Sequence, residues 1–191
     1  MEKAATKYET GVIHGRFQIL HNDHLKYLLS GKQLCRHLVI GITNPDPSMV
    51  RRETVDPNRS TFIANPLTYY ERYVLIHSVM QENDIDLNDL SIVPLPINKP
   101  DLYQYYVPLD AVFFLSIYDD WGRKKLNYFE SMGLKTHVIR KVSIEEKGIS
   151  ASEIRKFMMN NQPWEHLVPK SIAHLMKQWK IPERLKKLIL A

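Results

Sequence analysis

Residues 15–24, GRFQILHNDH, combine the side chains that most often bind phosphate. Arg16 offers a planar fork of N–H donors that matches phosphate oxygens, and Gly15 permits a sharp turn or a close backbone approach. His21 and His24 are three residues apart, so they share one face if a helix begins there. A helix start would add unpaired N–H groups and the positive end of its dipole. The stretch therefore indicates a polyphosphate site, with two histidines that only cap a helix as the alternative.

A second segment, KGISASEIRKFM, predicts another anion site near the end of the chain. Ser150 and Ser152 precede a helical run that contains Arg155. Hydroxyls, helix N–H groups and a guanidinium would then meet at one positive helix end. The simpler interpretation is an ordinary N-cap with no ligand.

Other common sites find little support in the sequence. A zinc site needs a further ligand or a His-Glu-x-x-His motif, and neither is evident among the remaining histidines 14, 37, 77, 137, 166 and 174. No Walker loop occurs. Cys35 is the single cysteine, which excludes an internal disulfide and favours a buried apolar role.

The elements that must position these residues alternate between strands and helices. Nearly continuous apolar runs predict strands at 10–15, 37–43, 90–96, 111–117 and 135–140. Helical patterns lie at about 22–35, 66–82 and 121–132, and from about residue 150 onward at 150–161, 169–179 and 182–190. We therefore expect a Rossmann-like open parallel sheet of about five strands with helices on both faces. Residues 1–148 would form this α/β domain and 149–191 a small helical appendage packed on it, as one folding unit.

The composition limits the class of protein. With 191 residues, 44% hydrophobic and 25% charged, the chain is typical of a globular protein. The net charge of +5 favours anionic partners. No apolar run reaches membrane-spanning length and the N-terminus lacks a secretory pattern, so we expect a cytoplasmic protein without a membrane partner. No aromatic-studded basic sheet face of an RNA-binding module is evident, so no nucleic-acid partner is expected.

The two motifs resemble the paired signatures of the nucleotidyltransferase α/β-phosphodiesterase superfamily. GRFQILHNDH is similar to Gly-Arg-Phe-x-Pro-x-His-x-Gly-His, and ISASEIR is similar to Ile-Ser-x-Thr-x-x-Arg. Within this superfamily the chain most resembles archaeal-type nicotinamide-nucleotide adenylyltransferases, through GRFQ, NPLTYYERYVLIHSVMQENDI and RKFMMNNQPWEHLVPKSI. The resemblance extends from about residue 10 to 187.

The resemblance implies a direct transfer of a nucleotidyl group, for which the acceptor phosphate is the nucleophile. His21 and His24 would donate to the triphosphate, while Arg16 and Arg155 would hold the phosphates that leave as pyrophosphate. Mg²⁺ would arrive bound to the nucleotide phosphates rather than in a protein cage.

The resemblance also implies a nucleotide pocket, and the motifs depart from the family pattern near it. Gly15 and Phe17 would line the pocket with the helix start at Ser150 and Ser152, although Phe17 could equally serve the core. Ser152 replaces the usual Thr but keeps the hydroxyl. Asp23 replaces a Gly between the histidines, and a carboxylate about 5 Å from a phosphate charge would cost on the order of 3 kcal/mol at an effective dielectric near 20. Asp23 should therefore point away, be offset by Mg²⁺ or serve the acceptor, or it simply complements the helix dipole.

The acceptor site is the less defined part. The segment NKPDLYQYYVP lies where the adenylyltransferases carry an aromatic side chain that stacks on nicotinamide. Tyr103 is the candidate for this role, with Tyr105 and Tyr106 as alternatives.

A second segment suggests a different acceptor. Asp119, Asp120 and Trp121 resemble the Gly-Asp-Asp-Trp segment of glycerol-phosphate cytidylyltransferases, where that segment faces the ligand. Carboxylates that only cap a helix are the simpler explanation.

The leading hypothesis is an adenylyltransferase that uses ATP and nicotinamide mononucleotide (NMN), releases pyrophosphate and makes NAD. The alternative is a CTP-dependent cytidylyltransferase that acts on a small phosphorylated or phosphonate acceptor. A nucleotide-binding regulator without turnover is a third hypothesis, motivated by Asp23 and the proline-rich loop 44–66. The sequence leaves assembly into a homo-oligomer open.

Overall fold

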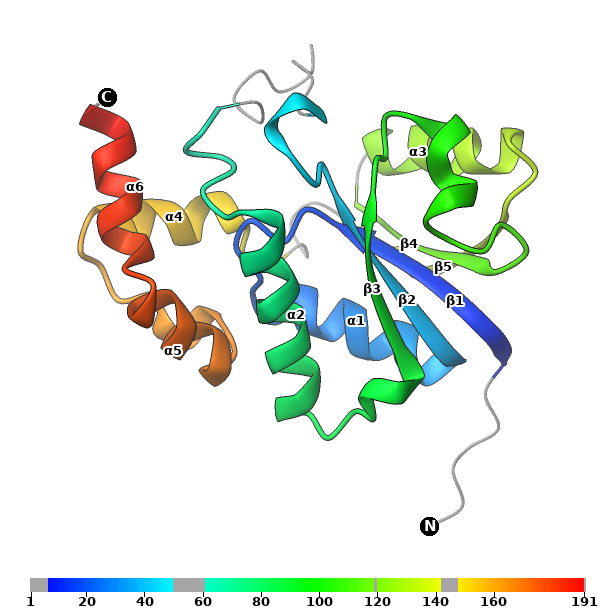
Figure 1. The fold of residues 1–191 in the computed structure, drawn as a ribbon, viewed down its shortest axis with the longest axis horizontal. Coiled ribbons are helices and arrows are strands. Elements are labelled where there is room, and N and C mark those ends of the chain that lie inside the picture. The colour runs from blue at the N-terminus through cyan, green and yellow to red at the C-terminus, as the bar shows by residue number, and fades with distance from the viewer. Residues whose placement is uncertain (1–6, 50–60, 119, 142–147, 191) are drawn as a thin grey trace.

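A computed structural model describes residues 7–49, 61–118, 120–141 and 148–190, and its core is a five-stranded parallel sheet (Figure 1). The strand order is β3-β2-β1-β4-β5, and every adjacent pair is parallel. The strands are β1 (Tyr8–Gly15), β2 (Cys35–Thr43), β3 (Leu90–Leu95), β4 (Val112–Ile117) and β5 (Lys135–Lys141). The predicted Rossmann-like sheet is confirmed. Since the chain extends from β1 toward β3 on one side and toward β5 on the other, β1 and β4 form the switch point where ligands of such sheets bind.

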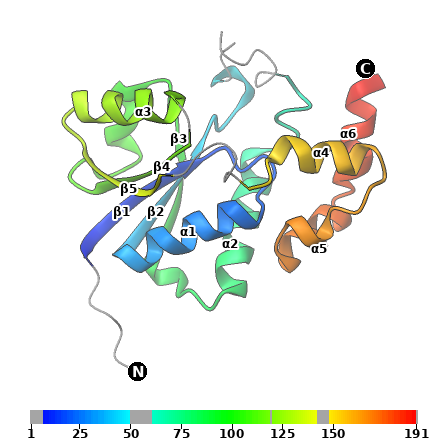
Figure 2. The same ribbon diagram turned by 180° about the vertical axis from the view of Figure 1, so that it is seen from behind.

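Helices cover both faces of the sheet. α1 (Asn22–Leu34) and α2 (Tyr69–Glu82) lie on one face and α3 (Asp120–Ser131) lies on the other (Figures 1 and 2). Each face has its own apolar cluster, one around Ile13, Leu38 and Phe114 and the other around Val12 and Phe129. These two layers hold the carboxyl ends of β1 and β4 in fixed positions.

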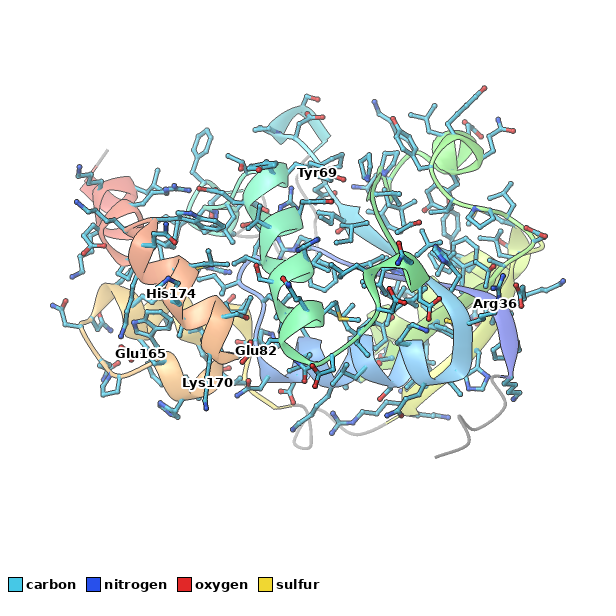
Figure 3. The ribbon with its side chains drawn as sticks, turned by 60° about the horizontal axis from the view of Figure 1, so that its bottom comes forward. Arg36, Tyr69, Glu82, Glu165, Lys170 and His174 are labelled. Atoms are coloured by element: carbon cyan, nitrogen blue, oxygen red, sulfur yellow. The ribbon has the colours of Figure 1, made fainter. Side chains whose placement is uncertain are left out.

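The last three helices pack beside α1 and α2. They are α4 (Ala151–Met159), α5 (Lys170–Gln178) and α6 (Ile181–Leu190). Their apolar side chains join the cluster of the α1 face through Ile154, Ile172 and Leu185, and Trp164 of the segment between α4 and α5 joins it too. Figure 3 shows Glu82 at the end of α2 close to the start of α5, where its carboxylate accepts from the Ser171 N–H at 3.1 Å. The helices are therefore fixed on the sheet domain by a shared core and by polar contacts, while the domain boundary at residue 148 stays a prediction.

The start of α2 differs from the sequence prediction. The helical pattern begins at about residue 66, but the helix begins after Thr68, whose side chain forms a capping box with Glu71. Tyr70 is 71% exposed, whereas Arg72 is 2% exposed. The charged Arg72 lies on the buried face because backbone carbonyls satisfy its guanidinium.

Residues 50–60 of the proline-rich loop lie outside the described residues, as does Asp119. In the described ranges, the helices are all too short or too polar to cross a membrane.

Candidate active site

A cavity of about 710 Å³ lies where β1 and β4 end, between the starts of α1 and α4 and one side of α3. Its described lining carries far more positive than negative groups. The four cations are Arg16, Lys124, Lys125 and Arg140, the three histidines are His14, His21 and His24, and the one carboxylate is Asp23. An excess of positive charge in a concave, partly buried site attracts and concentrates anions.

The predicted pair of histidines comes together at the start of α1. His21 is the N-cap residue and His24 lies in the first turn, with ring centroids 3.8 Å apart. Burial, together with His21 and Arg16, holds the pKa of His24 well below its usual value. In the described part of the chain, Nδ1 of His24 is buried and has no hydrogen-bond partner. His24 is thus a neutral, preorganised hydrogen-bonding group beside a helix N-terminus.

Gly15 and Phe17 shape the turn that leads to these histidines. A Cβ atom on Gly15 would lie 2.9 Å from Cζ of Phe17, so only glycine lets the ring fold back under the strand end. Phe17 adopts a φ of 52°, is fully buried, and meets the His24 ring edge-on at 5.2 Å. Both residues border the cavity, and Phe17 also belongs to the core cluster.

The start of α4 also lines the cavity. Ser150 makes a capping box with Glu153: its hydroxyl accepts from the Glu153 N–H, and its own N–H donates to the Glu153 carboxylate at 2.8 Å. The ordinary N-cap alternative therefore describes Ser150. Ser152 lines the cavity and accepts a 2.9 Å hydrogen bond from Nη2 of Arg155.

Arg155 lies behind this wall rather than in it. Its Nη1 donates to the backbone carbonyl of Gln18, its side chain is buried, and it is not among the lining residues. Burial and the neighbouring Arg16 lower the pKa of Arg155 to about 10, so the group stays charged at neutral pH. Arg155 thus links the start of α4 to the turn after β1, and its direct contact with phosphate stays a prediction.

Asp23 turns toward the segment before α4. A Cβ atom on Gly148 would lie 1.8 Å from Oδ2 of Asp23, and Nζ of Lys26 is 3.4 Å from Oδ1. The carboxylate thus packs over the bare backbone of Gly148. Any side chain at position 148 would displace it.

The predicted acceptor tyrosine, Tyr103, does not line the cavity. Tyr103 was expected to stack on a ligand, but it is 2% exposed, packs edge-on against Phe129 and donates its hydroxyl to the carbonyl of Ile97 at 2.6 Å. Its ring fills the core between α3 and the sheet, so this expectation is corrected. Of its alternatives, Tyr105 is 72% exposed and Tyr106 packs at the margin of the same core cluster.

The predicted Asp-Asp-Trp segment lies at the start of α3. Asp120 is the first residue of the helix, is 87% exposed and pairs with Arg123 at 3.2 Å, as a plain helix-start carboxylate would. It is not among the lining residues of the cavity. Asp119 and the side chain of Trp121 lie outside what the structure describes.

Sequence reasoning missed two residues that hold the site together. Arg72 donates to carbonyls at the ends of β1 and β2, among them Arg16 at 3.1 Å and Thr43 at 2.8 Å. The Gln18 amide pairs with both the N–H and the carbonyl of Leu67 at 2.9 Å. Arg72 could have been found from its position, because it shares a helix face with the apolar residues Leu75, Ile76 and Val79.

Paired histidines and clustered cations at the switch point of an open parallel sheet suit a polyphosphate anion. The comparisons with known proteins place the chain among the nucleotidyltransferases. The sequence model of the Cytidylyltransferase-like family matches residues 12–157, and the chain belongs to this family.

Known relatives include enzymes for different nucleotides. The chain is 45% identical over 177 residues to a phosphonoformate cytidylyltransferase from Streptomyces viridochromogenes, covering 93% of this chain and 95% of that protein. It is 31% identical over 179 residues to a nicotinamide-nucleotide adenylyltransferase from Thermococcus sibiricus, covering 93% and 88%. A bifunctional NMN adenylyltransferase/ADP ribose pyrophosphatase from Francisella tularensis shares the fold with a TM-score of 0.66 at 19% identity. That match covers 94% of this chain and about half (53%) of the bifunctional protein.

Proposed function

We propose that this nucleotidyltransferase transfers a cytidylyl group from CTP to a small acceptor that carries a phosphonate or phosphate group. The observation that carries the transfer chemistry is the cavity lined by Arg16, by His21 and His24 at the start of α1, and by the start of α4. The choice of CTP and of a small acceptor is supported by the 45% identity to the Streptomyces cytidylyltransferase across nearly the whole of both chains.

The proposed step needs no protein nucleophile. An oxygen of the acceptor attacks the α-phosphorus of CTP, and the bond from that phosphorus to the bridging oxygen of the β-phosphate breaks. The electron pair of that bond leaves with pyrophosphate. His24 and His21 donate hydrogen bonds to the phosphate oxygens where charge accumulates, and Arg16 neutralises the leaving pyrophosphate. Arg155 positions the α4 start against this group by linking Ser152 to the turn after β1.

A divalent cation would enter with the nucleotide. The described residues contain no cluster of three or more His, Cys, Asp or Glu side chains that could hold a metal ion. Asp23 is the one carboxylate of the described cavity lining, which fits a metal bound mainly by phosphate oxygens. A similar structure from Francisella tularensis was solved with AMP and a manganese ion, which supports a divalent metal, and Mg²⁺ is our candidate.

Adenylyl transfer from ATP to NMN is the second candidate. It is supported by several archaeal nicotinamide-nucleotide adenylyltransferases at 28–31% identity, each covering about 93% of this chain. In this chain Tyr103 is buried away from the cavity, so nicotinamide stacking would require another aromatic residue, and Tyr118 and Tyr128 line the cavity.

The decisive experiment incubates purified protein and Mg²⁺ with CTP or ATP and one of four acceptors: phosphonoformate, methylphosphonate, glycerol phosphate or NMN. We expect pyrophosphate release and a cytidylylated product, identified by mass spectrometry, with CTP and a phosphonate. NAD formation from ATP and NMN alone would instead establish the second candidate. Absence of pyrophosphate with every pair, despite nucleotide binding, would favour a regulator. Residence in the cytoplasm stays a prediction.

A further inference from the structure

The α3 side of the cavity holds a polar residue that the proposed transfer step does not use. His14, next to last in β1, lines the cavity together with Lys125 of α3. Its ring centroid lies 5.4 Å from that of Phe129, which packs the imidazole against α3. His14 is only 7% exposed, and in the described ranges neither of its ring nitrogens has a hydrogen-bond partner.

A buried imidazole without partners is costly, because both nitrogens lost their water on folding. Burial and the nearby charge of Lys125 hold the pKa of His14 well below its usual value. The ring is therefore neutral and presents one N–H donor and one acceptor nitrogen. Lys124 and Lys125 add positive charge to the same wall.

These properties define the group that would fit. An oxyanion accepts a hydrogen bond from the neutral imidazole and is neutralised by a lysine ammonium, which makes a charge-assisted contact. A neutral carboxamide could bond to the imidazole but would gain little from the lysine charge. The wall therefore favours a negatively charged group over an amide.

We propose that His14 and Lys125 form an acceptor subsite that binds a carboxylate carried next to the phosphonate, and that this subsite selects the acceptor. The inference deepens the proposed function and rests on it, since the phosphonate oxygen is the nucleophile in the same cavity. It assigns a role to His14, which lies in β1 and takes no part in the proposed transfer step.

Three phosphonates of similar size test the charge directly. Phosphonoformate carries the carboxylate, carbamoylphosphonate replaces it with an amide, and methylphosphonate lacks it. We expect wild-type kcat/KM to fall at least about tenfold from the first to either of the others, as the loss of a charged hydrogen bond implies.

Two variants test the residues. His14→Val and Lys125→Met should each raise the KM for phosphonoformate about tenfold, while the KM values for the nucleotide and for methylphosphonate rise by no more than about threefold. Lys125→Arg should keep most of the activity. His174→Val and Lys135→Met, which replace exposed residues outside the cavity lining, are the matched controls and should leave all constants unchanged.

The outcomes separate this inference from the proposed function. If wild-type protein releases no pyrophosphate from CTP with any of the three phosphonates or with glycerol phosphate, the proposed function fails. If it accepts glycerol phosphate but none of the phosphonates, only the subsite is overturned. If it cytidylylates all three phosphonates equally well, or if the two variants weaken nucleotide and acceptor alike, only the subsite is overturned. Because Lys125 is not a core residue, Lys125→Met still decides the question if His14→Val fails to fold.

Discussion

Replacement of Arg72 by methionine should destabilise the protein strongly and also disturb the cavity. The side chain is 2% exposed and its guanidinium makes five donor contacts to backbone carbonyls, namely those of Thr68, Arg16, Thr43, Asn44 and Pro45. Methionine replaces the aliphatic stem but has no donor, so these carbonyls would be left unsatisfied. Removing a buried charged partner of this kind costs about 3–5 kcal/mol.

Urea unfolding at pH 7.5 measures this cost. With an m-value of about 2 kcal/mol/M, the midpoint should fall by about 2 M. The conservative variant Arg72→Lys should recover little, because one ammonium cannot reach the ends of two strands. Activity of the folded fraction should also fall, since Arg72 holds the carbonyl of Arg16.

Arg123→Met is the control, because Arg123 is exposed on α3 and pairs only with Asp120 in the contacts described for it. Its free energy of unfolding should change by less than about 0.5 kcal/mol. If Arg72→Met lost less than about 1 kcal/mol, or kept full activity, the assigned role of the buried guanidinium would be wrong.

Three further predictions follow from the same geometry. His24→Ala should lower kcat by about two orders of magnitude with little change in nucleotide Kd or in melting temperature, and an equal loss of stability and activity would instead indicate a packing role. Gly148→Ala should impair folding or activity because its Cβ would overlap the carboxylate of Asp23. The double variant with Asp23→Gly should recover most of the loss. A double variant as impaired as Gly148→Ala would refute the contact. The buried, neutral state of His14 and His24 makes stability fall as the pH drops below about 6.5, because the unfolded chain then binds protons that the native state does not. Urea midpoints at three pH values measure how the free energy of unfolding changes with pH, by up to about 1.4 kcal/mol per pH unit for each histidine. His14→Gln should reduce this pH dependence. An unchanged pH dependence in the variant would contradict the neutral state assigned to His14.

The sheet and the end of the cavity at the starts of α1 and α4 were predictable because short-range patterns encode them. The apolar runs predicted all five strands, and the spacing of His21 and His24 placed both rings at one helix start. Capping residues such as Ser150 are local as well, since their partner Glu153 lies within the same turn.

The acceptor end was not predictable for the opposite reason. Tyr103 and Phe129 are far apart in sequence, and only packing shows that the tyrosine fills the α3 core instead of facing the ligand. The contact of Asp23 with Gly148 likewise joins distant segments and depends on the absence of a side chain. The cation excess at Lys124, Lys125 and Arg140 emerges only when α3 and β5 are brought beside β1.

The central claim is that the starts of α1 and α4 hold the triphosphate as it splits. A crystal structure with Mg²⁺ and a non-hydrolysable CTP analogue tests it directly. We predict the phosphate chain between His21, His24 and Arg16 on one side and the Ser150–Ser152 turn on the other. Phosphates bound instead along Lys124 and Lys125, with both helix starts empty, would contradict it.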